Sequence, residues 1–186
     1  MELEGLRVAV LAGEGVEDLE YWVTVMRLRE AGAQVTSAGL KHETVRGKNG
    51  LAIPVEVEIA SLDPANFDAL VIPGGHMPDK LRRYPAVTDF VAAIHAAEKP
   101  IGIICHGGLI AISARIVRGS RATGSLGIRD DLVNAGATWV DEAAFRDANL
   151  VWGRVVEDIP AFCRELVAAF AERRSAGQPE RRARAS

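Results

Sequence analysis

The sequence predicts one α/β domain built on an open, mostly parallel β-sheet with helices on both faces. Short apolar runs alternate along the chain with segments whose apolar residues recur at helical spacing, a pattern typical of strands joined by helical crossovers. Several of these runs are apolar at nearly every position, as expected for strands buried on both faces. With 186 residues, 48% of them hydrophobic, the chain is long enough for one domain with a sizeable core.

In the N-terminal half, strands are predicted at Leu6–Ala12 and Gln34–Ala38. A helix is predicted between them at Val16–Ala31, ended by Gly32, because apolar residues recur there at three-to-four spacing. These residues are Leu19, Trp22 or Val23, Met26 and Leu28. Residues 41–59 break the rhythm, and Asn49-Gly50 between two β-rich segments predicts a small β-hairpin.

In the C-terminal half, the apolar runs Phe67–Ile72 and Pro100–Ile104 predict two buried strands. The remaining predicted elements are helices at Asp79–Arg83, Val87–Ala97, from Cys105 to about Ala114, and Arg129–Ala135, a short strand at Arg121–Thr123, a strand pair at Ala144–Arg146 and Leu150–Gly153, and a last helix at Ile159–Ala171. We therefore expect the domain to span residues 1–172, followed by a basic disordered tail over 173–186.

Composition and charge exclude several classes of protein. The formal net charge of the chain is −3. The tail holds five arginines and one glutamate, a net charge of +4, so residues 1–172 carry a net charge of −7. An acidic body argues against nucleic acid as a partner. No apolar run is long enough for a membrane span, and two cysteines do not make a disulfide framework. With no apolar leader pattern before Leu6, we expect a cytoplasmic protein with reduced thiols.

Unusual residues follow three of the predicted strands: Gly13–Glu20, Pro73–Asp79 and Cys105–Gly108. Ligands of open α/β sheets bind beyond the carboxyl ends of the strands, so these segments predict the site. Cys105 stands where a strand turns into a helix, and His106 follows it. Helix N–H groups at such a turn favour a thiolate, which makes Cys105 the candidate nucleophile. Cys163 shares a helix face with Phe162 and Leu166 and is expected to be a buried apolar residue.

The positions of the four histidines restrict the chemistry. They are His42, His76, His95 and His106, so none follows the candidate nucleophile at a distance. This order excludes an α/β-hydrolase triad and a glutamine amidotransferase triad. His106 adjoins the thiol, and His76 is predicted to be solvent-exposed. No Cys, His and carboxylate spacing fits a metal, and we expect none.

Acidic residues crowd the start of the first helix. The glycines of Gly13-Glu14-Gly15 do not complete a dinucleotide-binding motif, and the carboxylates oppose a pyrophosphate, so no dinucleotide cofactor is expected. Glu17 and Glu20 are three residues apart and share one helix face near the core. A buried carboxyl has a raised pKa and can exchange a proton with a thiol. The amides of Gly74 and Gly75 are candidate donors for an oxyanion.

Three groups of motifs resemble the PfpI family of intracellular cysteine peptidase-like proteins, relatives of the parkinsonism-associated protein deglycase. They are Glu17–Glu20, Phe67–Gly75 and Lys99–Gly107, and Gly127–Asp131 and Asn134–Asp141 extend the likeness to about residues 5–171. The resemblance implies a flavodoxin-like fold, a homodimer or larger ring, and Cys105 as nucleophile beside His106. It also implies Glu20 against the thiol, Glu17 nearby, and Asp79 of a neighbouring subunit completing a Cys-His-acid triad.

The resemblance implies activity on a small-molecule carbonyl or on a peptide. Our leading hypothesis is a cofactor-free cysteine enzyme acting on methylglyoxal-like dicarbonyls or their protein adducts, a glyoxalase or deglycase of the stress response. The alternatives are an intracellular cysteine peptidase or amidase and a redox-sensing stress protein with an oxidisable Cys105. The chain departs from the family pattern at Thr24 and Gly108, which replace prolines, and at Ser125, which replaces a tyrosine of hyperthermophilic peptidase members.

Overall fold

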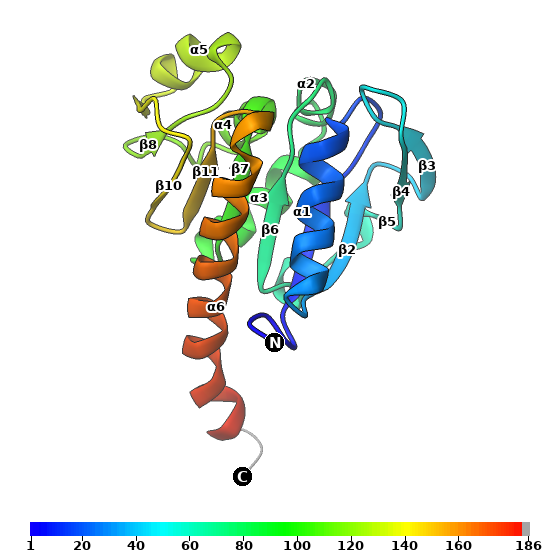
Figure 1. The fold of residues 1–186 in the computed structure, drawn as a ribbon, viewed down its shortest axis with the longest axis vertical. Coiled ribbons are helices and arrows are strands. Elements are labelled where there is room, and N and C mark those ends of the chain that lie inside the picture. Colours follow the sequence, from blue (N-terminus) through cyan, green and yellow to red (C-terminus); the bar gives the residue numbers. More distant parts are fainter. Residues whose placement is uncertain (184–186) are drawn as a thin grey trace.

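A computed structural model describes residues 1–183 of the chain, with a seven-stranded sheet at its centre (Figure 1). The strand order is β10-β11-β7-β6-β1-β2-β5, and every pairing is parallel except that of β10 with β11. The strands are β1 (Arg7–Leu11), β2 (Gln34–Gly39), β5 (Val57–Glu58), β6 (Ala69–Ile72), β7 (Ile101–Ile104), β10 (Ala144–Asp147) and β11 (Leu150–Gly153). The predicted fold class is therefore confirmed.

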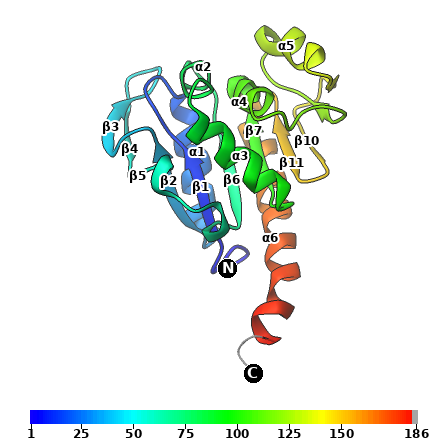
Figure 2. The same cartoon turned by 180° about the vertical axis from the view of Figure 1, so that it is seen from behind.

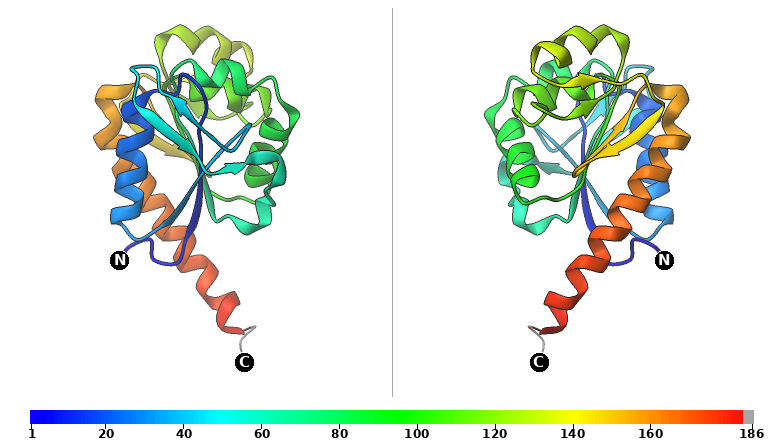
Figure 3. Two further views of the ribbon diagram at one scale, coloured as in Figure 1. Left: turned by 90° about the vertical axis from the view of Figure 1, so that its right-hand side faces the viewer. Right: turned by 90° about the vertical axis from the view of Figure 1, so that its left-hand side faces the viewer.

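Helices cover both faces of the sheet. One face carries α1 (Asp18–Glu30) and α6 (Ile159–Ala183), and the other carries α2 (Met77–Leu81), α3 (Pro85–Ala96) and α4 (Gly108–Ser113) (Figures 2 and 3). A further helix, α5 (Arg129–Asn134), packs on α4 and on a small parallel pair, β8 (Arg121–Ala122) and β9 (Thr138–Trp139). With helices on both sides, strands β6, β7 and β11 are buried at every position, which explains their continuous apolar sequences.

The first helix buries only some of the predicted apolar positions, among them Leu28. Leu19, Val23 and Met26 are 47%, 39% and 60% exposed, whereas Glu20 and Tyr21 are almost completely buried. Tyr21 reaches the core because its hydroxyl donates to Ser37 Oγ at 2.9 Å. Apolar spacing therefore predicted the buried side of α1 only in part, whereas the prediction that Glu20 lies near the core is confirmed.

The predicted β-hairpin is confirmed and forms a separate two-stranded sheet. Its strands are β3 (Glu43–Arg46) and β4 (Ala52–Val55), joined by the turn that contains Asn49-Gly50. Gly50 has a φ of 100°, a conformation that a residue without a side chain adopts at no steric cost. The hairpin lies beside the sheet edge formed by β2 and β5, at the end of the sheet where β1 runs into α1 (Figure 1).

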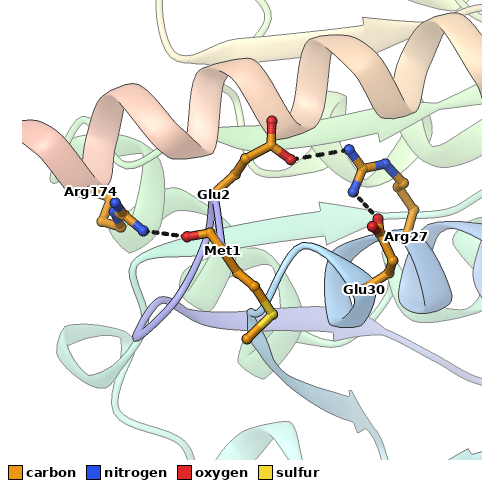
Figure 4. Close-up of polar contacts among 5 residues, drawn as sticks. All are labelled: Met1, Glu2, Arg27, Glu30 and Arg174. Carbon is orange, nitrogen blue, oxygen red and sulfur yellow. Dashed lines mark hydrogen bonds and ion pairs between the residues drawn. The ribbon is translucent and has the colours of Figure 1, made fainter.

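The C-terminal helix is longer than predicted. It continues beyond Ala171 to Ala183, so residues 173–183 are helical where an irregular tail was expected; residues 184–186 lie outside the described part. Within this extension the Arg174 guanidinium donates to the Met1 carbonyl at 2.7 Å (Figure 4). Glu2 pairs in turn with Arg27 of α1, which also pairs with Glu30. No helix over residues 1–183 has the length and apolarity needed to cross a membrane.

Candidate active site

Cys105 lies at a sharp turn between strand β7 and helix α4, as predicted for a nucleophile. Its φ is 57°, in the left-handed region that residues with a side chain seldom occupy, and the side chain is half-buried. A backbone held there by its surroundings stores strain, a feature that clusters at functional sites. The sulfur lies 3.3 Å from His106 Nδ1, so the structure brings the predicted Cys105–His106 pair together.

Glu20 of α1 faces the same sulfur from the other side. Its side chain is 0% exposed, its Oε2 accepts the Gly74 N–H at 2.6 Å, and it lies close enough to Cys105 for each group to shift the pKa of the other. Burial, reinforced by the negative charge of Glu17, raises the pKa of Glu20 to about 7 although the Gly74 bond opposes the shift. The pair Cys105–Glu20 is therefore placed to exchange a proton near neutral pH.

The pKa of the Cys105 thiol is raised and not lowered. This corrects the expectation that the N–H groups of the turn favour a thiolate. Burial and the charge of Glu20 raise the pKa of Cys105 to about 12, against smaller opposing effects of the His106 and Gly75 amides. The two amides and the six-residue helix α4 therefore do not offset the rise in the Cys105 pKa that loss of water causes. An ionised sulfur in this site requires that its proton move to Glu20.

Gly74 and Gly75 follow β6, and both amides were predicted to be oxyanion donors. In the structure the two glycines have different roles. The Gly74 amide is occupied by Glu20, so it is not a free oxyanion donor. A Cβ at Gly74 would lie 2.7 Å from Glu20 Oε2 and 2.9 Å from Cys105 Cβ, so only glycine lets these groups meet. The Gly75 amide faces the sulfur and remains the candidate oxyanion donor.

Glu17, predicted as a second acidic residue near the thiol, is the N-cap of helix α1. Its Oε2 accepts the amides of Leu19 and Glu20 at 2.8 and 2.9 Å, and it is 5% exposed. It acts on the site through its charge, which helps to raise the pKa of Glu20.

Asp79 forms no hydrogen bond with Cys105 or His106 within this chain. It stands on α2, 59% exposed at its side chain, and pairs with Arg83. The triad across a subunit interface involves a second chain and stays a prediction.

His76 is exposed, as expected, although its charge reaches His106 and, together with burial, helps to lower the pKa of that imidazole. Cys163 is 7% exposed and its burial raises its pKa, so it is the inert thiol that was predicted.

Two departures from the family pattern have structural explanations. A Cβ at Gly108 would lie 2.8 Å from Ile128 Cδ1, so the glycine lets this side chain pack against the turn. Ser125 donates its amide to the Cys105 carbonyl at 3.5 Å, and its hydroxyl accepts the Gly127 amide at 3.4 Å. For Thr24 the structure gives a buried position on α1 and no reason for the replacement of proline.

Sequence reasoning missed the contacts that join the hairpin to the start of α1. Asp18, treated above as one of several acidic first-turn residues, is 1% exposed and accepts the amides of Asn49 and Leu51, both at 2.7 Å. Asn49 also donates its side-chain amide to Glu17 Oε1 at 2.9 Å. The Asn-Gly signal predicted the hairpin but not where it docks. Among the residues whose side chains the structure describes, no cluster of three His, Cys, Asp or Glu is arranged to hold a metal ion.

The fold and the site together define a flavodoxin-like α/β protein with a cysteine at a strand-to-helix turn, a neighbouring histidine and a buried glutamate. The DJ-1/PfpI family model matches residues 6–169, and the chain belongs to this family.

Two relatives and one solved structure illustrate the likeness. Deglycase PYRAB04690 of Pyrococcus abyssi is 38% identical over 162 residues, which cover 87% of this chain and 98% of that protein. General stress protein 18 of Bacillus subtilis is 40% identical over 167 residues, covering 88% and 97%. A two-domain protein of Anabaena variabilis with DJ-1/ThiJ/PfpI-like and ferritin-like domains matches with a TM-score of 0.86 and 35% identity. That match covers 88% of this chain and 47% of the other.

Proposed function

We propose that this protein is a cofactor-free cysteine enzyme that converts methylglyoxal-like dicarbonyls, or their adducts on proteins, to hydroxy acids. The observation that carries the proposal is the contact of Cys105 with a buried glutamate whose pKa is raised to about 7. A base with a pKa near the working pH is suited to moving a proton in both directions. The name of the Pyrococcus abyssi relative, a deglycase, supports the same substrate class.

In the first step the Cys105 sulfur adds to the aldehyde carbon of methylglyoxal. A carbon–sulfur bond forms, Glu20 accepts the thiol proton, and the aldehyde oxygen becomes the hydroxyl of a hemithioacetal by taking up that proton. Proton transfer during the addition replaces a preformed thiolate, which agrees with the raised pKa of Cys105. The Gly75 amide, which faces the sulfur, supports the oxygen while it carries negative charge.

In the second step Glu20 removes the hydrogen of the former aldehyde carbon and a proton is returned to the neighbouring carbon, which gives the thioester of lactate. Water then cleaves the carbon–sulfur bond, releasing lactate and the Cys105 thiol, so the sum is methylglyoxal plus water to lactate. His106, with its Nδ1 at 3.3 Å from the sulfur and a lowered pKa, is a neutral imidazole at neutral pH that can assist the water.

Lactate formation from methylglyoxal tests the proposal. We expect turnover by the wild type and by Cys163→Ala, and loss of turnover in Cys105→Ala and Glu20→Gln. Cys163→Ala is a matched control because it removes the second free thiol, which lies in the core. Equal rates for the wild type and Cys105→Ala would overturn the proposal.

A redox-sensing role is the second candidate, favoured by the half-buried thiol beside a protonated carboxyl and by the name of the Bacillus subtilis stress protein. Intact-mass analysis after mild peroxide tests the redox-sensing role, with two added oxygens expected on Cys105 and none on Cys163.

The peptidase alternative needs Asp79 from a second chain. A panel of fluorogenic peptides, tested with the wild type and with Asp79→Asn, tests that prediction.

A further inference from the structure

Lys48 lies at the entrance to the Cys105 site because of where the hairpin docks. Its amide donates to the Val16 carbonyl at 2.7 Å, and Val16 forms an antiparallel bridge with Gly75. The Gly75 amide in turn faces the Cys105 sulfur. The main chain at Lys48 is thus joined to the site through two successive backbone contacts.

The turn that carries Lys48 is fixed to α1. The buried Asp18 carboxylate accepts the amides of Asn49 and Leu51, and the Asn49 side chain donates to Glu17. Gly47 packs directly on Asp18, where a Cβ would lie 2.4 Å from Oδ1. These contacts on both sides of Lys48 hold its Cα in one place relative to Glu20 and Cys105.

The positive charge of Lys48 acts on two groups of the site, lowering the pKa of each. Its positive charge reaches both Glu20 and His106, which lie on different elements around the sulfur. The residue is exposed, and among side chains described in the structure it has no ion-pair partner. The carboxylates that contact the hairpin, Glu14, Glu17 and Asp18, accept hydrogen bonds from amide donors.

We infer that Lys48 is a specificity residue that attracts the anionic group of a substrate to the entrance of the Cys105 site. A positive charge without a partner beside a nucleophile favours an electrophile that carries a carboxylate or phosphate group over a neutral one. The inference rests on the proposed function for its substrate class, small carbonyl compounds, and adds that anionic members of this class are preferred.

Alkylation of Cys105 by iodoacetate and by iodoacetamide tests the inference without any turnover. Both reagents form one carbon–sulfur bond and release iodide, and they differ in the charge of the incoming group. Because the same sulfur reacts, the ratio of the two rates cancels changes in the pKa of Cys105. We expect Lys48→Gln to lower the iodoacetate-to-iodoacetamide ratio roughly threefold, the effect of one charge at a solvated entrance.

Two variants serve as controls. Lys48→Arg keeps the charge and is expected to keep the ratio. Lys41→Gln makes the same change of net charge at an exposed lysine that lines a separate cavity of about 580 Å³ with Tyr84 and Glu43, and it is expected to leave the ratio unchanged. Added salt should reduce the wild-type ratio toward that of Lys48→Gln. Equal ratios in the wild type and Lys48→Gln would overturn the inference. The proposed function is tested separately, because absence of lactate formation would overturn it without changing the alkylation ratio.

Discussion

Glu20 accepts the Gly74 amide through Oε2 at 2.6 Å, and this bond holds the carboxyl beside the glycine turn that packs on Cys105. The other oxygen, Oε1, is buried and accepts no hydrogen bond from the described part of the chain. A carboxyl whose pKa is raised to about 7 in this position can take up the Cys105 proton near neutral pH.

This arrangement predicts how the reactivity of Cys105 depends on pH. The two groups titrate as a coupled pair, and the first proton leaves with a midpoint near 7, the pKa of Glu20. We expect the rate of alkylation of Cys105 by iodoacetamide to rise around that pH in the wild type, because the pair then has a site for the thiol proton. The measurement is a pH series of single-alkylation rates followed by mass spectrometry.

In Glu20→Gln the proton acceptor is absent, and so is the negative charge that opposes the thiolate. The pKa of Cys105 in this variant is expected to lie above 7 and below the value of about 12 that applies beside a charged Glu20. The midpoint of alkylation should therefore move upward from the wild-type one. An unchanged midpoint would show that Glu20 does not share the proton.

The same carboxyl predicts a pH-dependent stability. Its pKa is 4.5 in the unfolded reference and about 7 in the folded protein, so the folded state binds more protons between these values. The free energy of unfolding contributed by Glu20 is thus fully present below pH 4.5 and is lost as pH rises through 7, by about 3 kcal/mol in total. In urea titrations between pH 4.5 and 7, the free energy of unfolding of the wild type should fall relative to that of Glu20→Gln as the pH rises. A constant difference from pH 4 to 8 would contradict a raised pKa.

Glu17→Gln separates the charge of the helix cap from its hydrogen bonds. The amide oxygen of glutamine can still accept the Leu19 and Glu20 amides, but the charge that raises the pKa of Glu20 is removed. We expect the midpoint of Cys105 alkylation to fall below that of the wild type. The change in the free energy of unfolding should stay within about 1 kcal/mol, as for a weakened cap. A midpoint that rises would show that Glu17 acts in another way.

The parallel sheet could be predicted because its strands are buried on both faces and their sequences are apolar throughout. Apolar spacing identified the buried side of α1 only in part, since Tyr21 is held in the core by Ser37, a residue distant in sequence. The helical extension to Ala183 was also missed, and the Arg174–Met1 contact within it joins segments from opposite ends of the sequence.

The members of the site could be predicted more readily than their roles. Cys105, His106 and Glu20 meet as the sequence motifs indicated. The raised pKa of the thiol depends on how much water is excluded, which no local pattern reports. Likewise, the loss of Gly74 as an oxyanion donor depends on which acceptor its amide finds, and this acceptor is 54 residues away.

Gly74→Ala tests the close packing on which the Cys105–Glu20 contact depends. The new methyl group would lie 2.7 Å from Glu20 Oε2, 2.8 Å from the His106 amide nitrogen and 2.9 Å from Cys105 Cβ, which are all held by the fold. Overpacking of this kind costs about 1–3 kcal/mol of unfolding free energy, and the displaced carboxyl should lose its proton exchange with the sulfur. We expect lower stability in urea and an alkylation midpoint shifted upward, as in Glu20→Gln. Gly127→Ala is the matched control, because a Cβ there meets its nearest neighbour at an ordinary 3.5 Å. A Gly74→Ala protein with wild-type stability and midpoint would show that the glycine is not needed for this contact.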